Sequence, residues 1–557
     1  MAVTTGNPRA RAASAWEPLY MPVFRALWIA SVASNVGTWM QNVGAAWLMT
    51  SLTTSAVLVA LLQTASSLPV FLLGLPAGAL ADVVDRRRLL LFTQGWMLLT
   101  AALLSVLTFL GLMSAWTLLA LTFLLGLGGA LNAPAWQAIV PELVPREQLP
   151  QAVALNSAGF NLARAVGPAL GGLLVAALGT AWVFLLNAIS YLAVLVVIYR
   201  WRRQERESAA PPETVMGAMA AGVRYARHAP ALQVVLLRVG VFVIAASALW
   251  ALLPVVTRHD IGLDATGYGI LLGSLGLGAV IGAVLLPRFR ETLSVDRMLV
   301  LAALVFAVAT LALGYMRNII LLDVFMLAAG IAWMASMSSF NVAVQTASPQ
   351  WVRARALGAY LLVFQGGLAL GSFGWGALAD RLGTSATLLV AALGLVAGLP
   401  TVLRWPLRPI EDLDLTPALY WPEPEVVISP ELNDGPVMVT VEYHVGPAEA
   451  KPFVEAMEGV RKLRRRDGAV RWRLYRDSAD PDRYVEAFLV PSWAEHLRQH
   501  TRTTVEDQVV EDRALAYQRP GTPTQVSHLI AVNSPDDVAL NQESGVRDQG
   551  SGVVSRH

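Results

Sequence analysis

The fold of this chain is decided by residues 26–81, which read ALWIASVASNVGTWMQNVGAAWLMTSLTTSAVLVALLQTASSLPVFLLGLPAGALA. This stretch of 56 residues contains no Asp, Glu, Lys or Arg. A helix rises about 1.5 Å per residue and needs about 20 apolar residues to cross the hydrocarbon of a bilayer. The stretch is therefore long enough to cross twice, with a turn at residues 51–55, and we expect a helical hairpin inside a membrane.

Similar runs without charge continue along the chain. Residues 89–141 form a second run of 53 residues, with a predicted turn at 111–114. Residues 148–163 and 165–199 together predict a third hairpin that turns at Gly179 and Thr180. Further runs follow at 239–257, 265–287, 298–316, 324–352, 356–379 and 382–403. The sequence thus predicts twelve transmembrane helices, six before residue 200 and six between about 234 and 404.

The composition agrees with an all-α polytopic membrane protein and excludes several kinds of site. Of the 557 residues, 55% are hydrophobic and 14% are charged, well below the charged fraction of a soluble domain. The chain has no cysteine, which excludes disulfides, thiol catalysis and cysteine-ligated metal. We expect no cofactor, no metal and no nucleic-acid partner. Residues 1–25 lack the short apolar core of a removable signal peptide.

The arginines are distributed unevenly between the predicted loops. Segments on the same side as the N-terminus hold 21 arginines between Arg9 and Arg408, whereas the other side holds Arg258, Arg317 and Arg381. Basic residues accumulate in cytoplasmic loops. We therefore expect a multi-pass protein of the bacterial plasma membrane with both termini in the cytoplasm.

The two sets of six helices echo each other. Residues 167–172, GPALGG, recur 200 positions later as residues 367–372, GLALGS. Repeated halves are typical of secondary transporters, whose site lies between the repeats. The predicted organisation is an N-terminal tail (1–22), helices 1–6 (23–200), a cytoplasmic linker (201–233) with a short surface helix at 213–228, helices 7–12 (234–404), and a proline-rich connector (405–435).

Beyond the connector the pattern changes to that of a small α+β domain. Strands are predicted at 437–445, 470–474, 484–490 and 525–532, and helices at 448–467 and 492–517. The order β-α-β-β-α-β is the ferredoxin-like arrangement. We expect a ferredoxin-like cytoplasmic domain at 436–532, followed by a disordered tail at 533–557.

Residues 78–88, GALADVVDRRR, resemble the loop 2–3 signature of the major facilitator superfamily. Gly78, Asp82, Arg86 and Arg87 fit this signature, whereas Val83 and the residue before Arg86 depart from it. The resemblance implies that Asp82 is a conformational latch on the cytoplasmic side; the alternatives are a solvated helix-end charge and arginines that contact lipid headgroups. Residues 376–383, GALADRLG, fit the same pattern but fall in a predicted outside loop, and we assign them no latch role.

Helix 5 carries a second signature. Its small residues and proline resemble the motif associated with antiporters of the superfamily, and comprise Gly159, Gly167, Pro168, Gly171 and Gly172. Small residues let helices approach closely, and proline weakens the backbone ladder where a bend is useful. The resemblance implies export rather than uptake.

Residues 20–405 as a whole are similar to the superfamily branch of enterobactin-exporter-like and transmembrane secretion effector permeases. The resemblance is carried by residues 24–28 (FRALW), 134–138 (PAWQA) and 161–168 (NLARAVGP). It implies export of a siderophore, drug or metabolite by alternating access, driven by the proton gradient. The region from 436 resembles the antibiotic-biosynthesis-monooxygenase group of small ferredoxin-like domains, on topology and on residues 496–500, HLRQH.

Polar residues at membrane depth are the candidate substrate-binding or gating residues, because each is costly in hydrocarbon unless it faces protein or water. Arg164 stands out, about 20 Å into helix 5, and its guanidinium would suit an anionic or polyhydroxylated aromatic ligand. The other candidates are amides and indoles in helices 1, 4, 5, 10 and 11: Asn35, Trp39, Asn132, Trp136, Asn161, Asn341, Gln345 and Gln365. Alternatively, Arg164 ties helices together and the amides pair between helices.

Charged and titratable residues elsewhere in the chain are candidates for other roles. No carboxylate lies near the middle of any predicted span, so Asp323, near the outer end of helix 10, is the candidate for proton coupling. In the C-terminal domain, His496 and His500 lie one turn apart without an evident third metal ligand, which favours a surface helix or a homodimer contact. A membrane sensor and a membrane-tethered enzyme acting through residues 436–532 are the alternatives to a transporter.

Overall fold

The computed structural model describes residues 16–201, 215–407, 416, 418 and 430–532. The chain divides into two compact units. Unit 1 contains the long apolar helices. Unit 2 combines residues 220–229 and 349–352 with the region from residue 411 onward. The predicted tail at 533–557 and most of the predicted connector lie outside the described residues.

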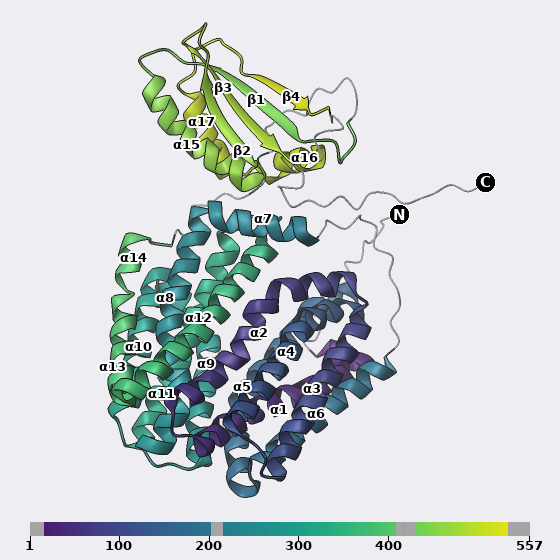
Figure 1. The fold of residues 1–557 in the computed structure, drawn as a ribbon, viewed down its shortest axis with the longest axis vertical. Helices are drawn as coiled ribbons and strands as arrows, with labels where there is room; N and C mark the ends of the chain where they lie inside the picture. Colours follow the sequence, from purple (N-terminus) through teal and green to yellow (C-terminus); the bar gives the residue numbers. More distant parts are fainter. Residues whose placement is uncertain (1–15, 202–214, 408–415, 417, 419–429, 533–557) are drawn as a thin grey trace, which may run out of the picture. The chain divides into compact units, whose positions relative to one another are not determined.

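The first half of unit 1 consists of six long helices with short turns between them (Figure 1). They are α1 (Pro22–Leu52), α2 (Ala56–Val83), α3 (Arg86–Phe109), α4 (Ala115–Leu143), α5 (Leu149–Leu178) and α6 (Thr180–Arg200), with short 3-10 turns at Glu17–Tyr20 and Arg146–Gln148. The three predicted hairpin turns are confirmed. Gly179, alone between α5 and α6, has φ +91°, a conformation that favours glycine.

The second half repeats this arrangement. Its helices are α8 (Pro230–Val255) with the π-helical turn η3 (Val256–Asp260), α9 (Ala265–Thr292), α10 (Val295–Tyr315), α11 (Ile319–Thr346), α12 (Arg353–Leu382), α13 (Thr384–Ala397) and α14 (Pro400–Arg404). Within the described residues, eleven helical segments are long and apolar enough to cross a membrane. Helix α1 has 31 residues but is not among them, and it carries Asn35, Gln41 and Asn42.

Consecutive helices run in opposite directions, so the bundle has two distinct ends. We call the end where α1 begins and α2 finishes the basic end, because Arg86, Arg87 and Arg88 lie there. The opposite end contains the start of α2 and the finish of α12. A helix is present in the region predicted at 213–228, as α7 (Val215–His228), and its last residues belong to unit 2.

The repeated hexapeptides have the same packing role in the two halves. A Cβ on Gly167 or Gly171 of α5 would lie 2.6 Å from Trp39 Cβ or 2.8 Å from Met40 Cα of α1. The equivalent Gly371 of α12 lies equally close to α8, with Ile244 O at 2.8 Å. In each half, therefore, the fifth helix is held against the first by glycines, because a larger side chain would separate their backbones.

Unit 2 contains a four-stranded antiparallel sheet in the order β2-β3-β1-β4. Its elements are β1 (Val437–His444), α15 (Ala450–Asp467), β2 (Arg471–Arg476), β3 (Arg483–Val490), α16 (Trp493–Arg502), α17 (Val505–Leu515) and β4 (Gln525–Ile530). In the register of β1 and β3, Val439 faces Phe488 and Val441 faces Glu486. The three helices cover one face of the sheet (Figure 1), and Phe453 and Met457 of α15 join the buried residues of β1 in the core.

One element of this region differs from the prediction. The prediction of a single helix at 492–517 is wrong, because the segment forms two helices, α16 and α17, with a break at Thr503 and Thr504. Thr504 is the N-cap of α17 and forms a capping box with Asp507, whose carboxylate also accepts from the Thr504 amide at 2.9 Å. Reciprocal caps of this kind satisfy the first free N–H groups of a new helix.

Unit 2 is held together by buried ion pairs and by contacts to its two short outlying segments. The Glu486 carboxylate, fully buried, accepts from Trp472 Nε1 at 2.8 Å, Tyr443 OH at 3.0 Å and Arg464 Nε at 3.1 Å. From the outlying segment 220–229, Arg224 donates to Glu495 of α16 at 2.9 Å. The guanidinium carbon of Arg502 lies 4.6 Å from the ring centre of Trp351, a cation–π contact.

Candidate functional site

A cavity of unit 1 has a volume of about 950 Å³ and is lined by residues of the first half, between Ser31 and Val194. Val140 and Pro141 near the finish of α4, and Leu149 at the start of α5, are among its lining residues. The cavity therefore extends to the basic end. Its lining side chains are apolar or neutral and polar: hydroxyls, carboxamides and one indole.

Four of the predicted site residues meet in this cavity, namely Asn35, Asn132, Asn161 and Trp136. Asn132 Oδ1 accepts from Thr93 Oγ1 at 3.0 Å and from Gln94 Nε2 at 3.2 Å, which fixes the orientation of its side chain. Asn35 Nδ2 donates to Ser31 Oγ at 3.4 Å. These contacts hold the amides in place at the cavity wall.

Arg164 lies on α5 one turn beyond Asn161, between two tryptophans. Its guanidinium carbon is 5.9 Å from the ring centre of Trp39 on α1 and 6.0 Å from that of Trp250 on α8. Arg164 Nε and Trp250 Nε1 are both buried and have no hydrogen-bond partner in the part of the chain that the structure describes. Buried donors are nearly always paired in folded proteins, so these two N–H groups could each donate to a further acceptor. Neither residue is among those that line the cavity of the first half. The sequence reasoning missed Trp250, whose one signal was an indole within the charge-free run at 239–257.

The candidate residues of the second half form a separate group. Gln345 Nε2 donates to Asn341 Oδ1 at 2.6 Å within α11, and Gln365 is half-buried in α12. None of the three lines the cavity of the first half.

Asp323 of α11, the candidate for proton coupling, accepts from Ser274 Oγ of α9 at 3.0 Å. This contact ties its carboxylate to a neighbouring helix of the same half.

The small residues of α5 contact two different helices. Gly159, like Gly167 and Gly171, faces α1, where a Cβ would lie 2.6 Å from Val32 Cγ2. Gly172 faces α9 of the other half, where a Cβ would lie 2.5 Å from Ala265 O and 2.8 Å from Gly269 Cα. The carbonyl of Pro168, itself buried, is similarly close to Gly269. The α5 motif therefore joins α5 to its own half and to the other half.

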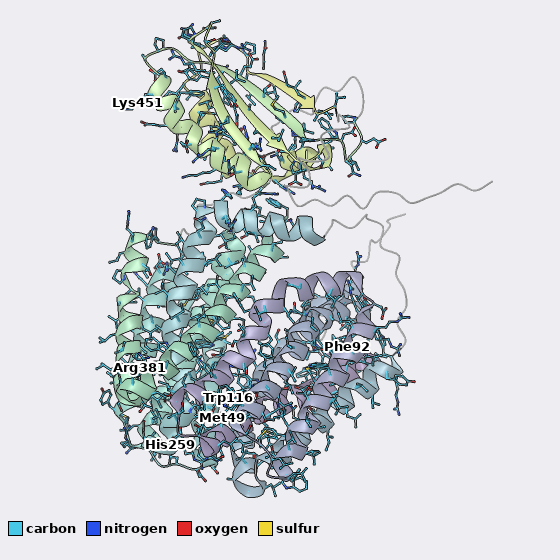
Figure 2. The ribbon with its side chains drawn as sticks, viewed as in Figure 1. Met49, Phe92, Trp116, His259, Arg381 and Lys451 are labelled. Carbon is cyan, nitrogen blue, oxygen red and sulfur yellow. The ribbon has the colours of Figure 1, made fainter. Side chains whose placement is uncertain are left out.

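The two halves are also joined at the opposite end by polar contacts. Asp380 in the last turn of α12 accepts from the Ala56 amide at 2.6 Å and from Ser55 Oγ at 2.7 Å, at the start of α2. The guanidinium of Arg258 in η3 lies 4.8 Å from the ring centre of Trp47 on α1. Figure 2 labels Met49 and His259 at this end, and Arg381, the neighbour of Asp380. Residues 376–383 were predicted to lie in an outside loop without a latch role; the structure places residues 376–382 at the end of α12, where Asp380 contacts the start of α2.

The predicted latch at the basic end is only partly described. Arg86 donates to Glu142 at 2.8 Å and Arg87 to the carbonyl of Tyr199 at 2.6 Å, so both contact the first half. A Cβ on Gly78 would meet no described atom within 4 Å. The side chain of Asp82 lies outside the described residues, and its latch role stays a prediction.

Unit 2 contains a cluster of three histidines. His500 Nε2 lies 3.3 Å from His496 Nε2, and the His528 ring centre lies 4.6 Å from that of His496. Burial, and then the neighbouring histidines, lower the pKa of His496 to about 3 and that of His500 to about 4. The sequence reasoning missed His528, which comes from β4. In the described part of the chain no group of three or more His, Cys, Asp or Glu side chains is arranged to hold a metal ion.

Comparisons with known proteins agree in pointing to membrane transporters. The chain is 24% identical over 367 residues to a staphyloferrin A transporter of Staphylococcus aureus, covering 65% of this chain and 90% of that protein. It is 27% identical over 417 residues to the multidrug efflux pump Tap of Mycolicibacterium fortuitum, covering 72% and 97%. It is 27% identical over 377 residues to an enterobactin exporter of Salmonella typhi, covering 67% and 90%.

Solved structures show the same fold. A bacterial homologue of the human lysosomal transporter Spinster matches with a TM-score of 0.56 at 15% identity, over 70% of this chain and 97% of that chain. The nucleoside transporter NupG matches with a TM-score of 0.54 at 12% identity, over 69% and 99%. Residues 13–536 match the family described as transmembrane secretion effector, which is most of the chain and includes the sheet of unit 2. The chain therefore belongs to the transmembrane secretion effector family of major facilitator transporters.

Proposed function

We propose that this protein exports a siderophore or a drug-like molecule from the bacterial cytoplasm by alternating access. The observation that carries the proposal is the cavity of about 950 Å³ that extends to the basic end, combined with contacts that join the halves at the opposite end. With the basic end in the cytoplasm and both termini on that side, this is the conformation that takes up cargo from inside. Helix α1 then serves as the twelfth span, its amides facing the cavity rather than lipid.

The chemistry of the lining supports a polar organic cargo. Neutral amides and hydroxyls donate and accept hydrogen bonds without fixing a charge, and Trp136 offers an aromatic face. A cavity of this size accommodates a ligand of drug size. The unpaired N–H groups of Arg164 and Trp250 add donors for an anionic or phenolic oxygen. A catechol-type siderophore would use all three features.

Coupling to the proton gradient is part of the proposal. Asp323 is our candidate carrier, because protonation would weaken the charge-assisted bond that its carboxylate accepts from Ser274 between α11 and α9. For unit 2, we propose a ferredoxin-like cytoplasmic domain, similar to the antibiotic-biosynthesis-monooxygenase group, with a regulatory or dimerising role. The strand order supports this assignment.

The test compares the culture medium of a deletion strain with that of its parent by untargeted metabolite analysis. Purified protein in liposomes is then assayed for flux of enterobactin, as the siderophore probe, and ethidium, as the drug probe, with and without a pH gradient. Arg164→Ala should slow flux of the transported probe, whereas Arg297→Ala, at an exposed position of the basic end, should not. Equal media and no flux of either probe would refute the proposal.

A further inference from the structure

One pentapeptide occurs twice in unit 1. Residues 78–82 and 376–380 both read GALAD. The first copy ends α2 and the second ends α12. These two helices come from different halves and pack against each other. Thr64 Oγ1 donates to Ala369 O at 2.8 Å, and Gly376 lies against Val57. The later residue of α12 thus meets the earlier residue of α2, which shows that the helices are antiparallel. Each copy therefore lies beside the start of the other helix, one at each end of the bundle.

The first glycines of the two copies differ in how closely they are packed. At the opposite end, a Cβ on Gly376 would lie 2.6 Å from Ala60 Cβ and 2.8 Å from Val57 Cα, so α12 touches α2 closely there. At the basic end, a Cβ on Gly78 would meet no described atom within 4 Å. Gly376 is therefore packed between the halves where they are joined, whereas the Cβ position of Gly78 has no described neighbour at the end that the cavity reaches.

The carboxylate of the packed copy acts as a helix cap from the other half. Asp380 accepts from the amides of Ala56 and Val57, at 2.6 and 3.4 Å, and from Ser55 Oγ at 2.7 Å. A negative charge is favourable at a helix start and unfavourable in the last turn of its own helix. Asp380 thus occupies an unfavourable position in α12, and its compensating contact is the start of α2.

Ser55 shows that the cap of α2 is exchangeable. Ser55 is the N-cap residue, but its side chain makes no cap bond to α2 and donates to Asp380 instead. Serine is favoured at this position because its oxygen accepts from the second or third helical N–H. If Asp380 withdraws, the Ser55 hydroxyl can turn and cap α2 itself. The start of α2 therefore has a partner whether the opposite end is closed or open.

We propose that Asp380 is a gating latch of the opposite end, which holds that end closed by capping α2 from the second half and is replaced by Ser55 when the end opens. The inference rests on the proposed alternating access. It gives a role to a residue that does not line the cavity and that lies outside loop 2–3. Asp380 is exposed, so its attraction to the helix start is screened by salt, and the equilibrium between closed and open forms should depend on ionic strength.

The test measures the distance between the halves rather than transport. The chain has no cysteine, so Leu112→Cys and Ile320→Cys place spin labels only at these two exposed positions of the opposite end, one in each half. Pulsed electron resonance on the full chain in nanodiscs gives the populations of the closed and open distances. Loss of the helix cap in Asp380→Ala should raise the open-to-closed ratio about fivefold. Asp380→Asn keeps an acceptor for the Ala56 amide but loses the charge, so its ratio should rise less. Both variants should abolish the effect of salt seen with Asp380 present.

The matched control is Asp264→Asn. Asp264 caps α9 by accepting from Gly267 N at 2.9 Å, at the same end but within one half, so its loss should leave the distances unchanged. Wild-type distances and salt response in both Asp380 variants would overturn the latch, as would an equal shift in Asp264→Asn. Flux of enterobactin or ethidium, measured on the same samples, separates the two proposals. If the protein transports a probe but the Asp380 variants keep the wild-type distances, only the latch is refuted. If the Asp380 variants shift the distances but neither probe is transported, only the export proposal is refuted.

Discussion

Replacing Gly172 by alanine tests whether the contact between α5 and α9 stabilises the observed conformation. The added Cβ would lie 2.5 Å from Ala265 O, whereas ordinary contacts begin near 3.4 Å. Both neighbours, Ala265 and Gly269, contribute backbone atoms, so no side chain can turn away. The two helices must separate by about 0.9 Å, the difference between these distances.

The magnitude follows from the cost of overpacking, which is about 1–3 kcal/mol. The strain exists only while α5 and α9 touch at the opposite end, so it acts on that conformation and not on one in which the halves have parted there. A difference of this size corresponds to a change of about 5- to 150-fold in the ratio of the two conformations. We expect Gly172→Ala to favour the form that is open at the opposite end.

The assay is the distance between spin labels at positions 112 and 320. Gly171→Ala is the matched control, because its Cβ would lie 2.8 Å from Met40 Cα of α1, within the same half. Its strain persists in both conformations, so it should lower the thermal stability without shifting the distances. A wild-type distance distribution in Gly172→Ala, or an equal shift in Gly171→Ala, would refute the reasoning.

Three further predictions concern charged groups in the two units. Arg164→Lys should restore less than half of the flux lost in Arg164→Ala, since an ammonium cannot reproduce the planar fork of the guanidinium; full rescue in the liposome assay would contradict this. Glu486→Ala should destabilise unit 2 by about 3–5 kcal/mol, because the buried donors of Trp472, Tyr443 and Arg464 lose the acceptor that they share, although Arg464 keeps its ion pair with Glu511. Glu486→Gln should cost less, and hydrogen exchange of residues 430–532 in the full chain measures both. The pKa values of His496 and His500 lie below that of a free histidine, so the unfolded chain binds protons that the folded unit does not, and stability should fall as the pH drops from about 6.5 towards 4, by up to about 1.4 kcal/mol per pH unit for each histidine. Hydrogen exchange at pH 7, 6 and 5 should show this loss, and His500→Gln should reduce it.

Much of the fold could be predicted from local pattern. Charge-free runs and polar turns located the hairpins, because hydrocarbon excludes charge and requires every backbone group to be paired within a helix. Alternation located β1 and β3, whose inward side chains are buried. The break between α16 and α17 was missed, because the capping box at Thr504 competes with a helix pattern that continues through it.

The candidate site was predicted less completely. We selected Asn35, Asn132, Asn161 and Trp136 because a polar side chain in hydrocarbon is energetically costly, and these four residues do line one cavity. The same argument selected Asn341 and Gln345, which pair with each other instead. Polarity in a span shows that a residue has a partner but does not identify that partner.

The sequence by itself determined that the chain crosses a membrane repeatedly, that its halves are related and that a small α+β region follows. These properties depend on amino-acid composition and on the spacing of apolar residues, both of which are visible in short stretches of the sequence. Only the tertiary structure decided which helices of the two halves touch, and hence that Asp380 caps α2 and Gly172 meets Gly269. Such contacts join residues about 100 to 325 positions apart, and their geometry depends on how whole helices pack rather than on any neighbouring residue.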